Sequence, residues 1–94
     1  MRVGILRLYL EFPGCHSLKE KRSRLKPLLA RLRREFNISV AEVERQDTWD
    51  QTVVCCALVS NAEGQTQRAL QAVIDWIENY WPDVSLIDDQ VEIL

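Results

Sequence analysis

Residues 4–36, GILRLYLEFPGCHSLKEKRSRLKPLLARLRREF, change their hydrophobic period from two residues to about 3.6 at a single turn. From Gly4 to Phe12 every second residue is Gly, Leu or Phe, which predicts a strand. Pro13 and Gly14 end this strand. Ser17 then begins Ser-Leu-Lys-Glu, a capping box typical of a helix start. The first unit of the fold is therefore a strand, a turn and a helix.

The helix expected over residues 18–36 has one apolar side. At 100° per residue its large apolar side chains occupy an arc of about 100°, the width expected of a helix packed on a core. They are Leu18, Leu25, Leu28, Leu29, Leu32 and Phe36. Pro27 lies opposite this arc, where water can reach the carbonyl of Ser23 that loses its amide partner. We expect a bend that is convex to solvent, and no break.

The rest of the chain predicts two strands, a second helix and a last strand. Residues 37–45 carry Glu42, Glu44 and Arg45 and suit an edge strand, whereas residues 52–59 are apolar on both sides and suit a central strand. We expect a hairpin loop at residues 46–51 between them. A helix begins at Ser60-Asn61 with Glu63 and ends before Pro82. Residues 84–94 form the last strand, with Ile87, Val91 and Ile93 on one side.

This order predicts a single α+β domain over residues 1–94, the ferredoxin-like βαββαβ plait. Right-handed crossovers place both helices on one face of a four-stranded antiparallel sheet and leave the other face bare. Val3, Ile5 and Tyr9 point to that bare face. Exposed apolar patches usually mark an interface, so we expect a homodimer or larger assembly through the sheet. The alternative is that Arg7 and Glu11 screen a modest patch.

Charge is segregated along the chain. Residues 18–36 hold eight of the twelve basic residues and two of the fourteen acidic ones, a net charge of +6, so the remainder carries −8. The eight basic residues are Lys19, Lys21, Arg22, Arg24, Lys26, Arg31, Arg33 and Arg34. A cationic helix on an anionic body attracts polyanions. We expect these residues to bind RNA or the ribosome; the alternatives are a partner protein with an acidic surface and simple solvation of the helix.

Four of these cations share one flank of the helix. Lys19, Arg22, Lys26 and Arg33 lie within about 60° of one another, while Arg24 and Arg31 lie on the other flank. The free amides that follow Ser17 add positive potential near Lys19 and Lys21, where a phosphate could bind.

The sequence indicates neither a metal nor a cofactor. Cys55 and Cys56 are adjacent, so on a strand they point to opposite faces. Cys15 stands beside His16, the single histidine, which is too few ligands for a zinc site. Three cysteines suit a reducing compartment. Arg7 and Glu11 interrupt the apolar opening, and no run is long enough for a bilayer, so we expect a cytosolic protein without membrane contact.

Enzyme activity is the less favoured class. An acylphosphatase-like site would use the loop after the first strand with Arg22, but the glycine-rich turn is missing and His16 has no orienting partner. No catalytic residue is therefore predicted. Residues 52–59 also lack the aromatics on which RNA-recognition domains stack bases. Trp49, in the hairpin loop, is either a lid over the sheet edge or an anchor for a partner.

Several short motifs resemble one family. They are Pro13-Gly14, Ser17-Leu-Lys-Glu-Lys-Arg22, Phe36-Asn37, Val40-Ala-Glu42, Gln46-Asp47 with Trp49, and Glu92-Ile-Leu94. On these residues the chain resembles the YlxP-like family of small bacterial proteins, a domain of unknown function, over nearly its whole length. The resemblance implies the ferredoxin-like fold, a bacterial cytosolic setting and a loose link to translation or ribosome assembly. It carries over no catalytic residue, and Pro27 departs from the family's uninterrupted helix.

Overall fold

The chain folds in the predicted order of elements, as a computed structural model of residues 1–94 shows. The elements are β1 (Arg2–Glu11), α1 (Leu18–Glu35), β2 (Ser39–Glu44), β3 (Gln51–Ser60), α2 (Glu63–Tyr80) and β4 (Ser85–Ile93). The expected α+β ferredoxin-like plait is thus confirmed. Neither helix is both long and apolar enough to cross a membrane.

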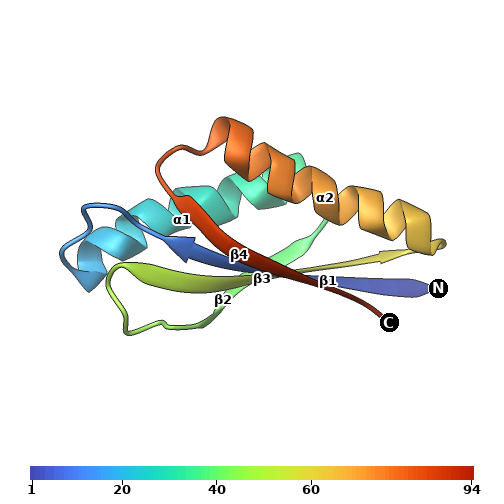
Figure 1. Cartoon of the computed structure of the whole chain (residues 1–94), viewed down its shortest axis with the longest axis horizontal. Coiled ribbons are helices and arrows are strands. Elements are labelled where there is room, and N and C mark those ends of the chain that lie inside the picture. The colour runs from blue at the N-terminus through green and yellow to red at the C-terminus, as the bar shows by residue number, and fades with distance from the viewer.

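The four strands form one antiparallel sheet in the order β2-β3-β1-β4. Both helices lie on the same side of this sheet, and the opposite face carries no element (Figure 1). The apolar strand β3 is central and the charged strand β2 is an edge, as predicted. The two ends of the chain lie close together, because β1 begins beside the end of β4.

The alternation in β1 places its leucines under the helices. Leu6, Leu8 and Leu10 are buried, while the residues between them lie on the bare face. Gly4 continues the buried row beneath α2, where an added Cβ would collide with Thr66. The glycine therefore allows the close approach of α2 to the sheet.

The capping box of α1 is present with one variation. The backbone N–H of Glu20 donates to Ser17 Oγ at 3.0 Å, and the Glu20 carboxylate accepts from the N–H of His16 at 3.0 Å. The box is reciprocal, but the Glu20 carboxylate accepts from the N–H of His16 and not, as in the usual form, from the N–H of the N-cap residue Ser17. The helix continues through Pro27, which is exposed, so the expectation of no break is confirmed.

Strand β4 differs from the expected alternation. The register with β1 shifts between Tyr9 and Leu10, so Leu10 pairs with Leu86 and Tyr9 pairs with Asp88. Leu86 consequently packs against the core, whereas Ile87 is 61% exposed. The β-bulge, which the sequence pattern did not indicate, changes which residue supports the core.

Candidate nucleic-acid interface

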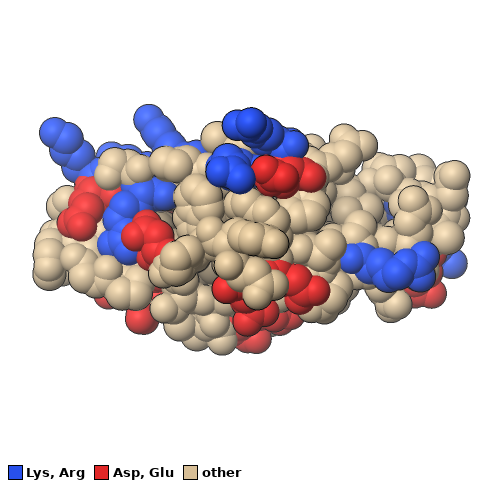
Figure 2. All heavy atoms as spheres, turned by 90° about the horizontal axis from the view of Figure 1, so that it is seen from above, with Lys and Arg blue, Asp and Glu red and all other residues tan.

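The eight basic side chains of α1 differ in their exposure and in their contacts within the chain. Four of them are exposed and form no hydrogen bond or ion pair within the chain: Lys19, Arg22, Lys26 and Arg34. We call these four residues the basic stripe. They lie within about 120° on the side of α1 that faces away from the sheet, and they span about 22 Å of helix at 1.5 Å per residue. Seen from above, most Lys and Arg side chains lie along the left and central part of one long edge of the molecule, with a few acidic side chains among them (Figure 2).

Lys21 is not part of this surface, and the prediction that it binds nucleic acid is wrong. Its side chain is fully buried. The ammonium donates to the carbonyl oxygens of Thr48, Arg45 and Gln51 at 2.6, 2.7 and 2.9 Å and lies 3.0 Å from the Glu42 carboxylate. The helical wheel contains the missed signal, because Lys21 lies inside the apolar arc.

The buried ammonium organises the loop between β2 and β3. Its carbonyl partners all belong to residues 45–51, a segment in which Arg45 has a positive φ of 61°. The Glu42 carboxylate also accepts a hydrogen bond from Thr52 Oγ1. A buried lysine is tolerated only when its charge and its donors are matched, as they are here. This loop presents Trp49, which is 51% exposed.

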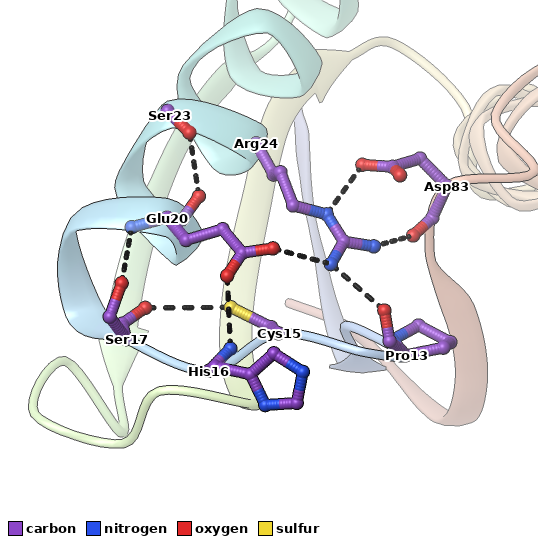
Figure 3. A network of polar contacts seen from close by, with 8 residues as sticks. All are labelled: Pro13, Cys15, His16, Ser17, Glu20, Ser23, Arg24 and Asp83. Carbon is purple, nitrogen blue, oxygen red and sulfur yellow. Dashed lines mark hydrogen bonds and ion pairs between the residues drawn. The ribbon is translucent and has the colours of Figure 1, made fainter.

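Arg24 joins three segments of the chain (Figure 3). Its guanidinium donates to the side chain of Asp83 at 2.9 Å, to the backbone oxygen of Asp83 at 2.7 Å and to the carbonyl of Pro13 at 2.9 Å. The hydrogen bond to Asp83 is the main cause of a raised Arg24 pKa. Because all three nitrogens already have partners and the side chain is only 17% exposed, little of it remains for a phosphate.

Arg31 and Arg33 are exposed but engaged. Arg31 forms an ion pair with Glu35 at 3.1 Å and lies over the ring of Trp76, 5.6 Å from its centroid. Arg33 donates to the carbonyl of Val40 at 2.8 Å. Both retain a positive charge near the basic stripe, but their positions are set by contacts within the chain.

The loop between β1 and α1 is contacted by Arg24 of α1. The Arg24 guanidinium donates to the carbonyl of Pro13 in this loop, whereas Arg22 forms no hydrogen bond or ion pair with it. The Cys15 thiol is buried and donates to the carbonyl of Ser17 at 3.5 Å, and the ring of His16 forms no hydrogen bond. No three His, Cys, Asp or Glu side chains are grouped so that they could hold a metal ion. Cys55 and Cys56 point to opposite faces of β3, as expected.

The bare face of the sheet is partly covered by its own side chains. The Arg45 guanidinium lies 5.7 Å from the centroid of the Tyr9 ring, and the Tyr9 hydroxyl donates to Gln90 at 3.3 Å. Screening therefore applies to the half of the face around Tyr9. The other half leaves Val3 and Ile5 half-buried, beside Val59, which is 68% exposed. An assembly through these residues stays a prediction.

Comparisons with known proteins extend over most of the chain. The family described as "Protein of unknown function (DUF503)" matches residues 3–91. "Uncharacterized protein YlxP" of Bacillus subtilis (strain 168) is 44% identical over 64 residues, which cover 68% of this chain and 70% of that protein. Among solved structures, "De novo designed protein Foldit4" is similar with a TM-score of 0.53 and 14% identity, over 100% of this chain and 97% of that one. The last similarity concerns the fold alone.

Proposed function

This chain belongs to the DUF503 family, as its resemblance to YlxP-like proteins implied, and we propose that it is a non-enzymatic RNA-binding protein whose docking surface is the basic stripe of α1. One observation carries the proposal. Four exposed cations without partners lie along one side of a helix, while the chain outside residues 18–36 has a net charge of −8. The field around the molecule is therefore polarised, and a polyanion is drawn to one side of it.

The stripe is suited to contacts with the RNA backbone. Flexible Lys and Arg side chains pair with phosphates, release condensed counterions and contribute affinity without reading the sequence. The contacts of Arg24, Arg31 and Arg33 hold the helix and its surroundings in place. We therefore propose weakly sequence-specific binding in which ribosomal RNA is the natural source of phosphates.

The salt dependence of binding tests the stripe. For four phosphate contacts, the slope of log affinity against log salt should be about −3, at about 0.7 to 0.9 per contact. Fluorescence anisotropy with labelled RNA measures it. Changing Lys19, Arg22, Lys26 and Arg34 together to Gln should remove most of the affinity and bring the slope near zero.

A matched pair of double variants distinguishes the effect of the stripe's charge on RNA binding from the effect of the net charge of the protein. Arg22→Gln with Lys26→Gln lowers the charge of the stripe by two, and Arg2→Gln with Arg68→Gln makes the same change at exposed positions outside α1. Only the first should reduce the slope, by about half. Equal effects of the two doubles, or no RNA binding at low salt, would overturn the proposal.

Two further outcomes identify the competing classes. Retention on immobilised polyglutamate, with no binding to RNA, would replace RNA by an acidic protein partner. Turnover of a phosphate ester or an acyl phosphate, abolished by Arg22→Ala, would replace binding by catalysis.

A further inference from the structure

An aromatic cluster lies where the ends of the two helices meet. Trp76 of α2 packs edge-on against Phe36 at a centroid distance of 6.2 Å and stacks on Trp81 at 5.7 Å. Tyr80, one turn after Trp76, is tilted against it at 6.1 Å. Phe36, Trp76 and Trp81 are partly buried and pack against the core, and Trp76 supports the outermost member of the cluster, Tyr80.

Tyr80 is the exposed face of this cluster. Its side chain is 69% exposed, and its hydroxyl forms no hydrogen bond within the chain. The ring is tilted by 44° against Trp76, which covers part of it and leaves most of it open to solvent. An exposed aromatic ring supported by a partly buried aromatic cluster is a candidate stacking platform.

The surroundings of the platform are cationic. The guanidinium of Arg31 lies over Trp76, and Arg34, which has no partner, is its neighbour three residues later on the same side of α1. The acidic residues of this part of α2, Asp75 and Glu78, lie at least about 100° around the helix from Trp76. A phosphate next to a base on Tyr80 would therefore lie near these arginines. The carboxylates of this region are engaged, Glu35 by Arg31 and Asp83, three residues after Tyr80, by Arg24.

We propose that Arg31, Arg34, Trp76 and Tyr80 form a site for an unpaired nucleobase, which stacks on Tyr80 while its phosphate meets Arg34. This inference rests on the proposed RNA binding and specifies its ligand as single-stranded RNA or an unpaired loop. Bases in a duplex are stacked on each other and cannot lie on a protein ring. Stacking tolerates every base, in keeping with the low sequence specificity of the basic stripe. Arg34 belongs to both surfaces, so one strand can pass from the platform along α1.

The test compares Tyr80→Leu with Tyr80→Phe. Leucine keeps an apolar contact with Trp76 but removes the ring, whereas phenylalanine keeps the ring. With a labelled single-stranded oligouridylate, Tyr80→Leu should bind about tenfold more weakly, the loss typical of one stacked base, and Tyr80→Phe should bind like the parent. Affinity for an RNA duplex of equal length should be unchanged in both variants.

A measurement on the unaltered protein makes the test independent of any folding defect. An abasic strand keeps the phosphates and removes the bases, so it should bind the parent about tenfold more weakly than the oligouridylate. Equal affinity for both strands, or Tyr80→Leu binding like the parent, would overturn the base site.

Failure of this inference can be told from failure of the proposed function. If the basic-stripe variants lose affinity while Tyr80→Leu and the abasic strand show no loss, RNA binding stands and the base site does not. If the parent binds neither the single strand nor the duplex at low salt, both are refuted.

Discussion

At the scale of single residues, Lys21 shows that charge alone does not define a binding surface. Lys19 and Lys21 are two positions apart on the same helix, but one is exposed without a partner and the other is fully buried. The difference is their angle on the helix, because 200° separates them. The ammonium of Lys21 serves as an internal cation that neutralises Glu42 and donates hydrogen bonds to the carbonyl oxygens of the loop.

Lys21→Met should therefore be strongly destabilising. The change leaves the Glu42 carboxylate and several carbonyls buried without their donor, and the loss of one partner of a buried pair costs about 3 to 5 kcal/mol. Urea denaturation measures the free energy of unfolding. The control is Lys19→Met, which should change it by less than about 0.5 kcal/mol. Similar small effects of both variants would show that the loop is held by other contacts.

Burial of Cys56 makes the stability of the fold depend on pH in alkaline solution. Burial, and secondarily the neighbouring Cys55, raise the pKa of its thiol from 9.0 to about 12. In the unfolded chain the thiol ionises near its ordinary pKa, while in the folded chain it stays protonated. The stability from the neutral thiol is thus complete below pH 9 and is lost as the pH rises toward 12.

Cys56→Val tests this dependence. The variant should lose less stability than the parent between neutral pH and pH 11, as measured by urea denaturation at each pH. The half-buried Cys55 provides the control, since Cys55→Val should keep most of the parent's alkaline loss. An unchanged alkaline profile in Cys56→Val would refute the assignment.

At the scale of elements, α1 combines an apolar side, a buried ammonium and an exposed basic stripe. Pro27 interrupts its hydrogen bonding on the exposed side, where no packing requires it. Pro27→Ala restores an amide that can donate to the carbonyl of Ser23. We expect the free energy of unfolding to rise by up to about 3 kcal/mol, the difference in helix propensity between the two residues.

The result of Pro27→Ala also bears on the shape of the basic stripe. A decrease in stability in urea denaturation would show that α1 needs a bend at Pro27 in order to seat Leu28 and Leu32. RNA affinity should change little if the stripe is already continuous across Pro27.

At the scale of the whole molecule, positive charge is concentrated on one long edge of the helix layer, and the sheet presents its partly covered face on the opposite side (Figures 1 and 2). The accessible surface of 5663 Å² is close to the value of about 5,600 Å² that mass scaling gives for an 11.0 kDa monomer. The candidate contact for assembly through the sheet is the local patch of Val3, Ile5 and Val59.

The mass of the protein in solution tests the dimer that this patch predicts. Sedimentation equilibrium should give about twice the chain mass of 11.0 kDa, and Ile5→Glu should give a monomer because it places a carboxylate in the apolar patch. Gln67→Glu, which adds the same charge on the helix layer, should leave the dimer intact. A mass of 11.0 kDa at all concentrations would contradict the prediction.

Most elements of the fold could be predicted because their signals are local. The alternation of Gly4 to Phe12, the capping box at Ser17 and Pro82 after α2 each depend on residues a few positions apart. The β-bulge opposite Tyr9 and Leu10 could not be predicted, since it depends on pairing between strands far apart in the sequence. The same holds for the candidate site: four of its eight proposed cations lie free on one surface, and Lys21 lies in the interior.

The amino-acid sequence by itself determined the element order, the ferredoxin-like plait and the concentration of positive charge in one helix, because periodicity, capping and composition act over a few turns. Tertiary structure alone decided which cations stay free. Arg24 meets Asp83 across 59 positions, and Lys21 reaches carbonyls 24 to 30 positions away. It also brought Arg31 over the ring of Trp76, which in turn contacts Tyr80. The physical reason is that the partner and the burial of a side chain are set by packing between elements, which a local pattern does not contain.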